Sequence, residues 1–255
     1  MATLRDIQLC ELEILREIDR VCREHDIPYR LSSGTFLGAI RHKSFIPWDD
    51  DLDVTMTLDG ALELEKYINR DKFFFQSVTT DYETPFLFFK IRKNDTVMKE
   101  EILENLNIHQ GIWVDVFPIV HASNTSIGKN LQYSISIVLH SFRCRFINAR
   151  KDPPKRKWME YIPKTIAMKI DRFLVWSVKS LGSRKSNEYF SFSNVSNRRP
   201  IKPKIFFDEY DEYEFEGYWF YGPRNSHDYL TMLYGEDYLI PKQYGHQVNY
   251  ENVKC

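Results

Sequence analysis

Residues 31–57 read LSSGTFLGAIRHKSFIPWDDDLDVTMT and contain a dense group of acids. Four aspartates fall within five positions, just after a Pro-Trp pair and at the start of a run in which apolar residues alternate. They are Asp49, Asp50, Asp51 and Asp53. Like charges this close repel one another, so such a stretch either lies open to water or binds a cation that neutralises it.

The alternation of residue types favours a strand that binds a metal ion. Side chains two positions apart in a β-strand share a face. Asp49, Asp51 and Asp53 would then line one face, while Leu52 and Val54 would point towards a core. Hard oxygen ligands at this spacing suit Mg²⁺ or Mn²⁺.

A short helix is predicted immediately upstream, because Ser32-Ser33-Gly34-Thr35 reads as a strand-to-helix turn. Ser33 or Thr35 would cap this helix, which would end near Arg41-His42. Free backbone N–H groups at a helix N-terminus bind phosphate. Taken singly, a capped turn and a solvated acidic loop are ordinary features; in this order they supply complementary parts of one reaction.

Two later strands carry charges in apolar surroundings. In the run at 86–92, Lys90 and Arg92 alternate with apolar residues and point to one face, where they would contact phosphate or stand as solvated strand-edge charges. Asp115 lies within the apolar run at 109–119. A carboxylate there is costly unless it is paired, binds a metal or faces water at a strand edge.

The remaining pattern predicts helices and strands interspersed along the chain, and therefore an α+β fold. Helices are expected at 3–25, 59–69 and 225–234 and within 125–182, strands at 29–31 and 73–78, a strand or hairpin from 206, and a loop at 183–200.

Charge is distributed unevenly along the chain. Residues 143–204 hold 17 Lys and Arg against four acids, although the whole chain has a formal net charge of −1. This asymmetry indicates a polyanionic partner or, in the ordinary case, a solvated basic face. The segment 155–158, Lys-Arg-Lys-Trp, and a later helix that mixes basic and aromatic residues could contact an anionic membrane peripherally.

The cysteines and the apolar runs bound the cellular location. Cys10, Cys22, Cys144 and Cys255 have no metal-ribbon spacing and read as free thiols of a reducing compartment. No apolar stretch has the length of a spanning helix, and the first residues show no apolar signal core. We therefore expect a cytoplasmic protein that can bind peripherally to the inner face of the membrane.

The block at 34–54 closely resembles the hallmark of the LicD family, GT-x-LGA-x-RH followed by IPWDDD. The family's Lys-x-Arg…Thr strand is matched at 90–96, and its GI-x-x-DIFP pattern at 111–118. A similar tail follows at 215–217 and 228–241, so the resemblance covers both ends of the chain and is weakest over roughly 122–204.

This resemblance implies a nucleotidyltransferase-like fold with a small mixed sheet flanked by helices. It implies transfer of phosphocholine from CDP-choline, or of a related group from another CDP-alcohol, to a glycan hydroxyl in lipopolysaccharide, teichoic acid or a capsule precursor that can be lipid-linked. Asp115 would be the third carboxylate of a triad with Asp51 and Asp53, with Asp49 as a further metal ligand and Glu216 as a candidate catalytic acid. The donor would be bound by Gly34, Thr35, Arg41, His42, Lys90 and Arg92.

Three segments are expected: a catalytic core at 1–122, a basic and mainly helical lobe at 123–204 that faces the acceptor or a membrane, and a C-terminal segment at 205–255 that packs back on the core. The alternatives are a CDP-ribitol or CDP-glycerol donor, true nucleotidyl transfer to a small molecule, and a non-enzymatic module that binds membranes or nucleic acid. The last leaves the ordered acids and Asp115 unexplained, so we expect no nucleic acid partner.

Overall fold

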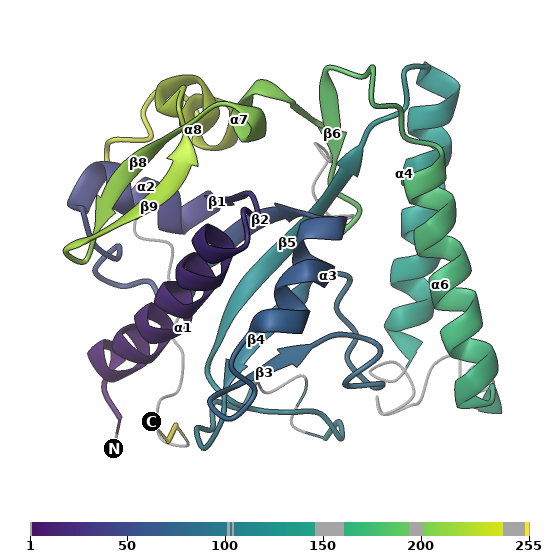
Figure 1. The fold of residues 1–255 in the computed structure, drawn as a ribbon, viewed down its shortest axis with the longest axis horizontal. Helices are drawn as coiled ribbons and strands as arrows, with labels where there is room; N and C mark the ends of the chain where they lie inside the picture. Colours follow the sequence, from purple (N-terminus) through teal and green to yellow (C-terminus); the bar gives the residue numbers. More distant parts are fainter. Residues whose placement is uncertain are drawn as a thin grey trace.

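The computed structural model describes residues 2–100, 103, 105–145, 161–193, 201–241 and 253–254. Within these residues a mixed β-sheet is flanked by helices and accompanied by a separate two-stranded hairpin, as Figure 1 shows. This arrangement confirms the predicted α+β fold.

The sheet is built around one long strand. In spatial order it contains β1 (Tyr29–Leu31), β2 (Asp53–Thr57), β5 (Trp113–His121), β4 (Phe89–Lys93) and β3 (Phe73–Gln76), while β6 (Glu188–Phe190) pairs with the end of β5 and β7 (Ile201–Pro203) pairs with β6. The β2–β5 pair is parallel and the others are antiparallel. β5 is buried over most of its length because its neighbours and the covering helices enclose it.

Helices α1 (Leu4–Glu24) and α3 (Leu58–Tyr67) contact each other and β5, and both lie in front of the sheet in Figure 1. α1 begins where the sequence predicts, because Thr3 and Asp6 form a reciprocal capping box. Its apolar face, which includes Ile7, Ile14 and Ile18, is fully buried.

The region around α2 (Ser33–His42) is completed by the C-terminal part of the chain: α7 (Ile205–Asp208), β8 (Tyr210–Phe215), β9 (Tyr218–Pro223) and α8 (Ser226–Tyr234). Phe36 of α2 makes edge contacts with the rings of Tyr213 and Tyr229, at centroid distances of 4.9 and 5.6 Å. Asn225 caps α8 by accepting a hydrogen bond from the backbone N–H of Asp228. Residues some 180 positions apart therefore form one packed unit.

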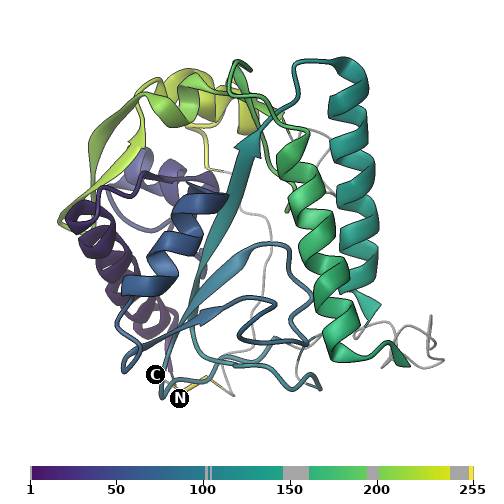
Figure 2. The same cartoon turned by 45° about the vertical axis from the view of Figure 1, so that its right-hand side comes forward.

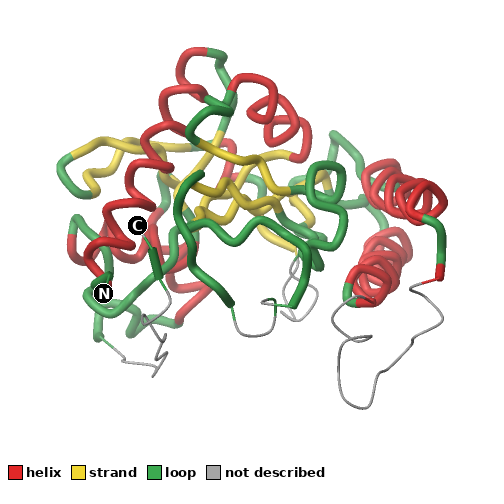
Figure 3. The backbone as a smooth tube through the Cα atoms, turned by 90° about the horizontal axis from the view of Figure 1, so that it is seen from below, coloured by secondary structure: helices red, strands yellow, loops and turns green. Residues whose placement is uncertain are grey.

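Helices α4 (Ser126–Arg143) and α6 (Lys164–Ser180) form an antiparallel pair at one edge of the molecule (Figure 2). Seen from below, the pair stands beside the sheet instead of above or below it (Figure 3). We refer to these two helices as the α4–α6 pair. No helix in the described ranges is long and apolar enough to cross a membrane.

Several boundaries differ from the predictions. The acidic strand begins only at Asp53, and Asp49 lies in a turn before it, in which the N–H of Asp49 donates to the carbonyl of Ile46 at 2.9 Å. Strand β4 begins at Phe89 instead of 86, and the predicted loop at 183–200 contains β6. The predicted caps of α2 are wrong, since its N-cap is Ser32 and makes no side-chain cap bond.

Two other sequence predictions meet the limits of the described chain. Cys10, Cys22 and Cys144 are free thiols, as predicted, whereas Cys255 lies outside the described residues. The basic segment at 155–158 also lies outside them.

Candidate active site

Three charged residues form a row across adjacent strands. The parallel β2–β5 register places Asp53 opposite Asp115, and the antiparallel β4–β5 register places Lys90 opposite Asp115. Residues directly opposite one another on neighbouring strands share a face of the sheet. Asp115 is 8% exposed and Lys90 is 2% exposed, and Lys90 Nζ lies 3.1 Å from Asp115 Oδ1. The sheet therefore brings the two predicted acids together.

Asp49 reaches the first turn of α2. A Cβ atom on Gly34 would lie 2.8 Å from Asp49 Oδ2, so glycine leaves the space that this carboxylate occupies. Gln8 of α1 donates to the backbone carbonyl of Asp49 at 2.9 Å and fixes the loop from the other side. The positive end of the α2 dipole favours an anion at this place. The helix terminus predicted to bind phosphate thus carries an acid of the chain itself.

Thr35 positions the start of β2. Its side chain is buried, and its Oγ1 accepts a hydrogen bond of 2.7 Å from the backbone N–H of Asp53. Thr35 does not line the cavity described below, unlike Gly34. The hydroxyl predicted to bind donor phosphate instead joins α2 to the strand that carries Asp53.

The carboxylates lie in a strongly negative environment. Burial, together with repulsion by Asp51 and Asp50, raises the pKa of Asp49 to about 7. Burial is also the largest cause that raises the pKa of Asp115 to about 6, although Lys90 opposes it. The pKa of Asp53 is raised well above its usual range by burial and by the nearby acids. A bound cation would relieve this repulsion.

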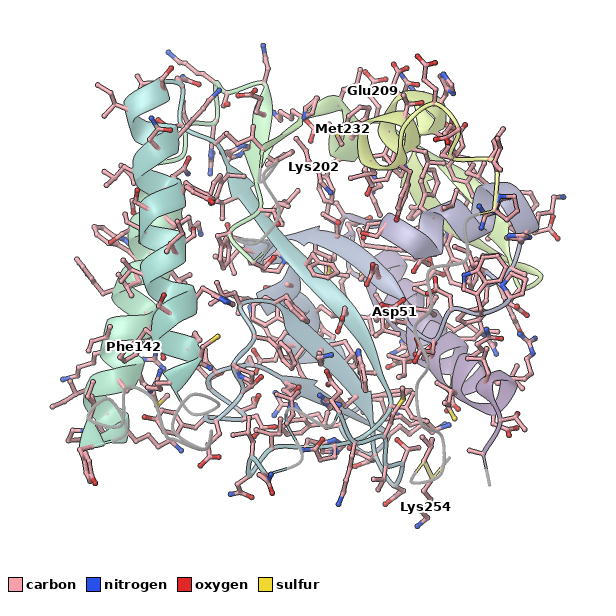
Figure 4. All side chains as sticks on the ribbon, turned by 180° about the vertical axis from the view of Figure 1, so that it is seen from behind. Asp51, Phe142, Lys202, Glu209, Met232 and Lys254 are labelled. Atoms are coloured by element: carbon pink, nitrogen blue, oxygen red, sulfur yellow. The ribbon has the colours of Figure 1, made fainter. Side chains whose placement is uncertain are left out.

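A cavity of about 360 Å³ opens beside these acids. Its volume lies within the range of small-ligand sites. One wall comes from α2 and the acidic loop and a second from the segment after α8; the lining residues include Gly34, Arg41, Asp49, Asp51, Asp53, Tyr234, Asp237, Tyr238 and Ile240. Figure 4 labels Asp51, which is exposed, near the middle of the view, whereas Phe142 marks the α4–α6 pair at the edge of the molecule. The cavity is therefore built from both ends of the chain.

Arg41 and His42 lie at the C-terminal end of α2, where the cavity begins. Arg41 lines the cavity, donates from Nε to His42 Nε2 at 2.8 Å, and donates to the carbonyl of Tyr238 at 3.3 Å. Burial and the neighbouring Arg41 lower the pKa of His42, so its ring stays neutral and can accept this hydrogen bond. Arg41 is thus held at the cavity wall by its hydrogen bonds to His42 and to the carbonyl of Tyr238.

Arg92 and Glu216 are engaged away from the cavity wall. Arg92 is fully buried and donates to Gln76 Oε1 at 2.8 Å and to the carbonyl of Gly111 at 2.6 Å. Glu216 accepts two hydrogen bonds from Arg5, at 2.9 and 2.7 Å, and one from Ser44 at 2.6 Å. The hydrogen bond from Arg5 is the largest cause that lowers the pKa of Glu216. These contacts indicate anchoring roles for both residues.

The donor set has the chemistry of a divalent cation site. Buried carboxylates that repel one another offer the hard oxygen ligands that Mg²⁺ and Mn²⁺ prefer. Across the described ranges, however, no three His, Cys, Asp or Glu side chains converge on one point as metal ligands do. The charge of the site therefore fits a cation, while closing around it would require the side chains to rotate.

One acid near this site, Glu11, belongs to none of the sequence motifs described above. Glu11 of α1 is 1% exposed, and burial and repulsion by Asp51, Asp50, Asp49 and Asp115 raise its pKa. The available signal is its position, since Glu11 lies four residues after Ile7 and three before Ile14 on the apolar face of α1.

Comparisons with known proteins give a consistent family. Residues 26–148 match the family described as LicD/FKTN/FKRP, nucleotidyltransferase domain. The chain is 26% identical to the lipopolysaccharide cholinephosphotransferase LicD of Haemophilus influenzae, over 94% of this chain and 93% of that protein. A shorter match, 32% identical over 56 residues, covers 22% of this chain and 21% of an uncharacterised protein of Rickettsia prowazekii. Every predicted metal ligand lies within the segment 26–148.

Proposed function

Because the chain belongs to the LicD family, we propose that it transfers phosphocholine to a hydroxyl group of lipopolysaccharide or a related cell-surface glycan. The relative from Haemophilus influenzae, a lipopolysaccharide cholinephosphotransferase by name, aligns over nearly the whole of both chains. The observation that carries the proposal is the group of mutually repelling acids, Asp49, Asp51 and Asp53, on one wall of a cavity of ligand size. Such a wall suits a substrate whose negative phosphates arrive with a cation.

The proposed donor is CDP-choline, and the proposed second product is CMP. The oxygen of the glycan hydroxyl would attack the phosphorus of the phosphocholine group, and the bond from that phosphorus to the CMP oxygen would break. Arg41 lies on the cavity wall with a planar, fully charged guanidinium that can bind two phosphate oxygens at once. We assign it to the donor diphosphate.

The hydroxyl proton requires an acceptor within the cavity. Asp49 lines the cavity, so its carboxylate can accept a proton from a hydroxyl group that is bound there. Glu216 is less suited, because its carboxylate is held by Arg5 and Ser44 and its pKa is lowered. We therefore assign proton acceptance to Asp49.

A divalent cation, Mg²⁺ or Mn²⁺, completes the proposal. Asp51, Asp53 and Asp115 would hold it, and Asp49 lies next to them. When bound, the cation would neutralise the donor diphosphate and the charge that develops on the departing CMP. Lys90, which is in contact with Asp115, would share that carboxylate with the cation or release it.

The experiment that tests this function is a CMP-release screen. Purified protein, Mg²⁺ and a lipopolysaccharide acceptor are incubated with CDP-choline, CDP-ethanolamine, CDP-ribitol or CDP-glycerol, and CMP is quantified by chromatography. We expect release from CDP-choline that depends on the acceptor. Release from CDP-ribitol or CDP-glycerol alone would keep the chemistry and change the donor, and release from none would contradict the proposal.

We further propose that the α4–α6 pair rests on an anionic membrane surface where a lipid-linked acceptor is presented. Its outer side chains are apolar, with Ile127 82% exposed and both Phe173 and Trp176 62% exposed. Lys169 and Arg172 are exposed on the same helix as these aromatic residues. Apolar and basic side chains together suit the interface of an anionic bilayer.

Flotation with vesicles tests the membrane contact. The wild type should float with vesicles that contain phosphatidylglycerol at low salt and not with pure phosphatidylcholine vesicles. A Phe173→Ser/Trp176→Ser variant should float less, while its CMP release with a water-soluble acceptor stays unchanged. A wild type that never floats would exclude the membrane contact and leave the transfer chemistry untouched.

A further inference from the structure

Glu11 is a buried carboxylate that no motif of the acidic stretch includes. It lies on the inner face of α1 between Ile7 and Ile14, and its Oε2 atom has no hydrogen-bond partner among the residues that the structure describes. Burying a carboxylate oxygen without a hydrogen-bond partner destabilises the folded state. An apolar residue at this position would continue the face of α1 without that cost.

Glu11 lies near the acids of the site. The charged groups that act on it most strongly are Asp51, Asp50, Asp49 and Asp115, and all of them raise its pKa. The geometry agrees, because Gln8, one helical turn before Glu11, donates to the carbonyl of Asp49 at 2.9 Å. α1 also contacts both β4 and β5, the strands that carry Lys90 and Asp115. Glu11 therefore faces the acids from a third element of the fold.

We propose that Glu11 supplies, from α1, a further carboxylate ligand to the divalent cation that the acids of β2 and β5 hold. The inference rests on the metal dependence proposed above. It explains why an acid without a hydrogen-bond partner on Oε2 stands on the apolar face of a helix, since the cation supplies the missing partner. It also gives the capping box at Thr3 and the Gln8 contact a common role, which is to fix the rotation of α1 so that Glu11 faces the site.

The test measures cation binding without any donor or acceptor. Mn²⁺ affinity is determined by electron paramagnetic resonance for the wild type, Glu11→Gln and Glu11→Asp, and thermal unfolding is followed in chelator and in excess Mg²⁺. Glu24→Gln serves as the matched control, because Glu24 lies on the same helix and is exposed. We expect Glu11→Gln to weaken Mn²⁺ binding roughly 10–100-fold, and Glu11→Asp to weaken it less.

Unfolding provides the second readout. In chelator, Glu11→Gln should unfold at a higher temperature than the wild type, because a buried charge among acids has been removed. In Mg²⁺ that advantage should shrink or reverse, whereas Glu24→Gln should follow the wild type in both conditions. If Glu11→Gln does not fold, the Mn²⁺ affinity of Glu11→Asp decides.

The outcomes separate this inference from the proposed function. Equal Mn²⁺ affinity in the wild type and both Glu11 variants overturns the inference alone. A wild type that binds no Mn²⁺ overturns the inference and the metal dependence together. Mn²⁺ binding that depends on Glu11 supports the inference even if the CMP-release screen finds no active donor.

Discussion

The candidate site and the α4–α6 pair both contain buried charged side chains, but only in the α4–α6 pair is each charge balanced by an opposite one. In the α4–α6 pair, Arg143 of α4 and Asp171 of α6 are each about 2% exposed and lie 3.0 Å apart, so each is matched by an opposite charge. In the site, burial and the charge of Asp51 raise the pKa of Asp49, Asp53 and Asp115, and Lys90 opposes this only at Asp115. A buried ion pair is typical of a structural role, whereas acids with too little counter-charge are typical of a ligand-binding site.

The α4–α6 pair also has polar side chains at inner positions and apolar side chains at outer positions. On α4 the inner positions include Gln132, whose amide donates to the carbonyls of His121 and Val178 at 3.1 and 3.0 Å. The outer positions include the exposed Ile127 and Val138. A helix that faces water usually shows the reverse pattern. A cation would therefore stabilise the interior of the site, and an apolar or lipid partner would stabilise the exterior of the α4–α6 pair.

The largest effect is expected when the ion pair between Arg143 and Asp171 is broken. Asp171→Asn leaves Arg143 buried without its counter-charge and should destabilise the fold by about 3–5 kcal/mol in urea unfolding. The double variant Arg143→Met/Asp171→Leu should recover most of that loss, because no buried charge remains. A loss below about 1 kcal/mol in Asp171→Asn would show that the pair is not the structural element described above.

The second prediction concerns the unmatched acids. Asp53→Asn and Asp115→Asn should each lower kcat/KM for CDP-choline by about two orders of magnitude or more, since a cation ligand is lost. In chelator, Asp53→Asn should unfold at the same temperature as the wild type or higher, whereas Asp115→Asn also removes the counter-charge of the buried Lys90 and should unfold at a lower temperature. Asp59→Asn, on the exposed surface of α3, is the isosteric control. Near-normal turnover in both site variants, or full activity in excess chelator, would contradict the assignment.

The third prediction is smaller and concerns the cavity wall. Arg41→Lys keeps the positive charge but loses the planar fork, so KM for the CDP donor should rise by roughly tenfold. Steady-state kinetics with CDP-choline measures it, and Arg70→Lys, outside the cavity lining, provides the control. Unchanged KM and kcat would remove Arg41 from the donor site.

The smallest expected effect is a pH dependence of stability. Asp49 ionises near pH 4 in the unfolded chain and near 7 in the fold, so between these values the folded state holds more protons. The free energy of unfolding in chelator should therefore fall as the pH rises from about 4 to about 7. Asp49→Asn should reduce this fall by about 1–2 kcal/mol, because solvent and salt screen part of the repulsion. Identical pH profiles of the two proteins would contradict the pKa shift.

Local signals in the sequence predict much of the fold and part of the site. The Thr3 capping box, the Asn225 cap and the apolar run of β5 are short-range features, and the structure contains each of them. The family pattern groups Asp53 with Asp115, and the β2–β5 register places them side by side. The caps and the buried strand could be predicted because neighbouring residues determine them.

The rest depends on contacts between distant residues. Asp49 does not extend β2, because its loop is held by Gln8 and packed against Gly34. Glu11 reads as a solvated helix acid until the packing of α1 is known. The wall from Tyr234 to Ile240 appears only when α8 packs on α2. Periodicity within one element cannot show which other element will cover it.

This wall has a consequence for the order in which the protein becomes active during synthesis. The acids at 49–53 emerge from the ribosome about 180 residues before Tyr234. At typical elongation rates of about 5–20 residues per second, that interval is roughly 10–40 s. Asp115 also emerges within this interval, so the cation ligands proposed on β2 and β5 all precede the last wall of the donor cavity. In the proposed mechanism, the nascent chain would therefore bind its cation before it can bind a substrate.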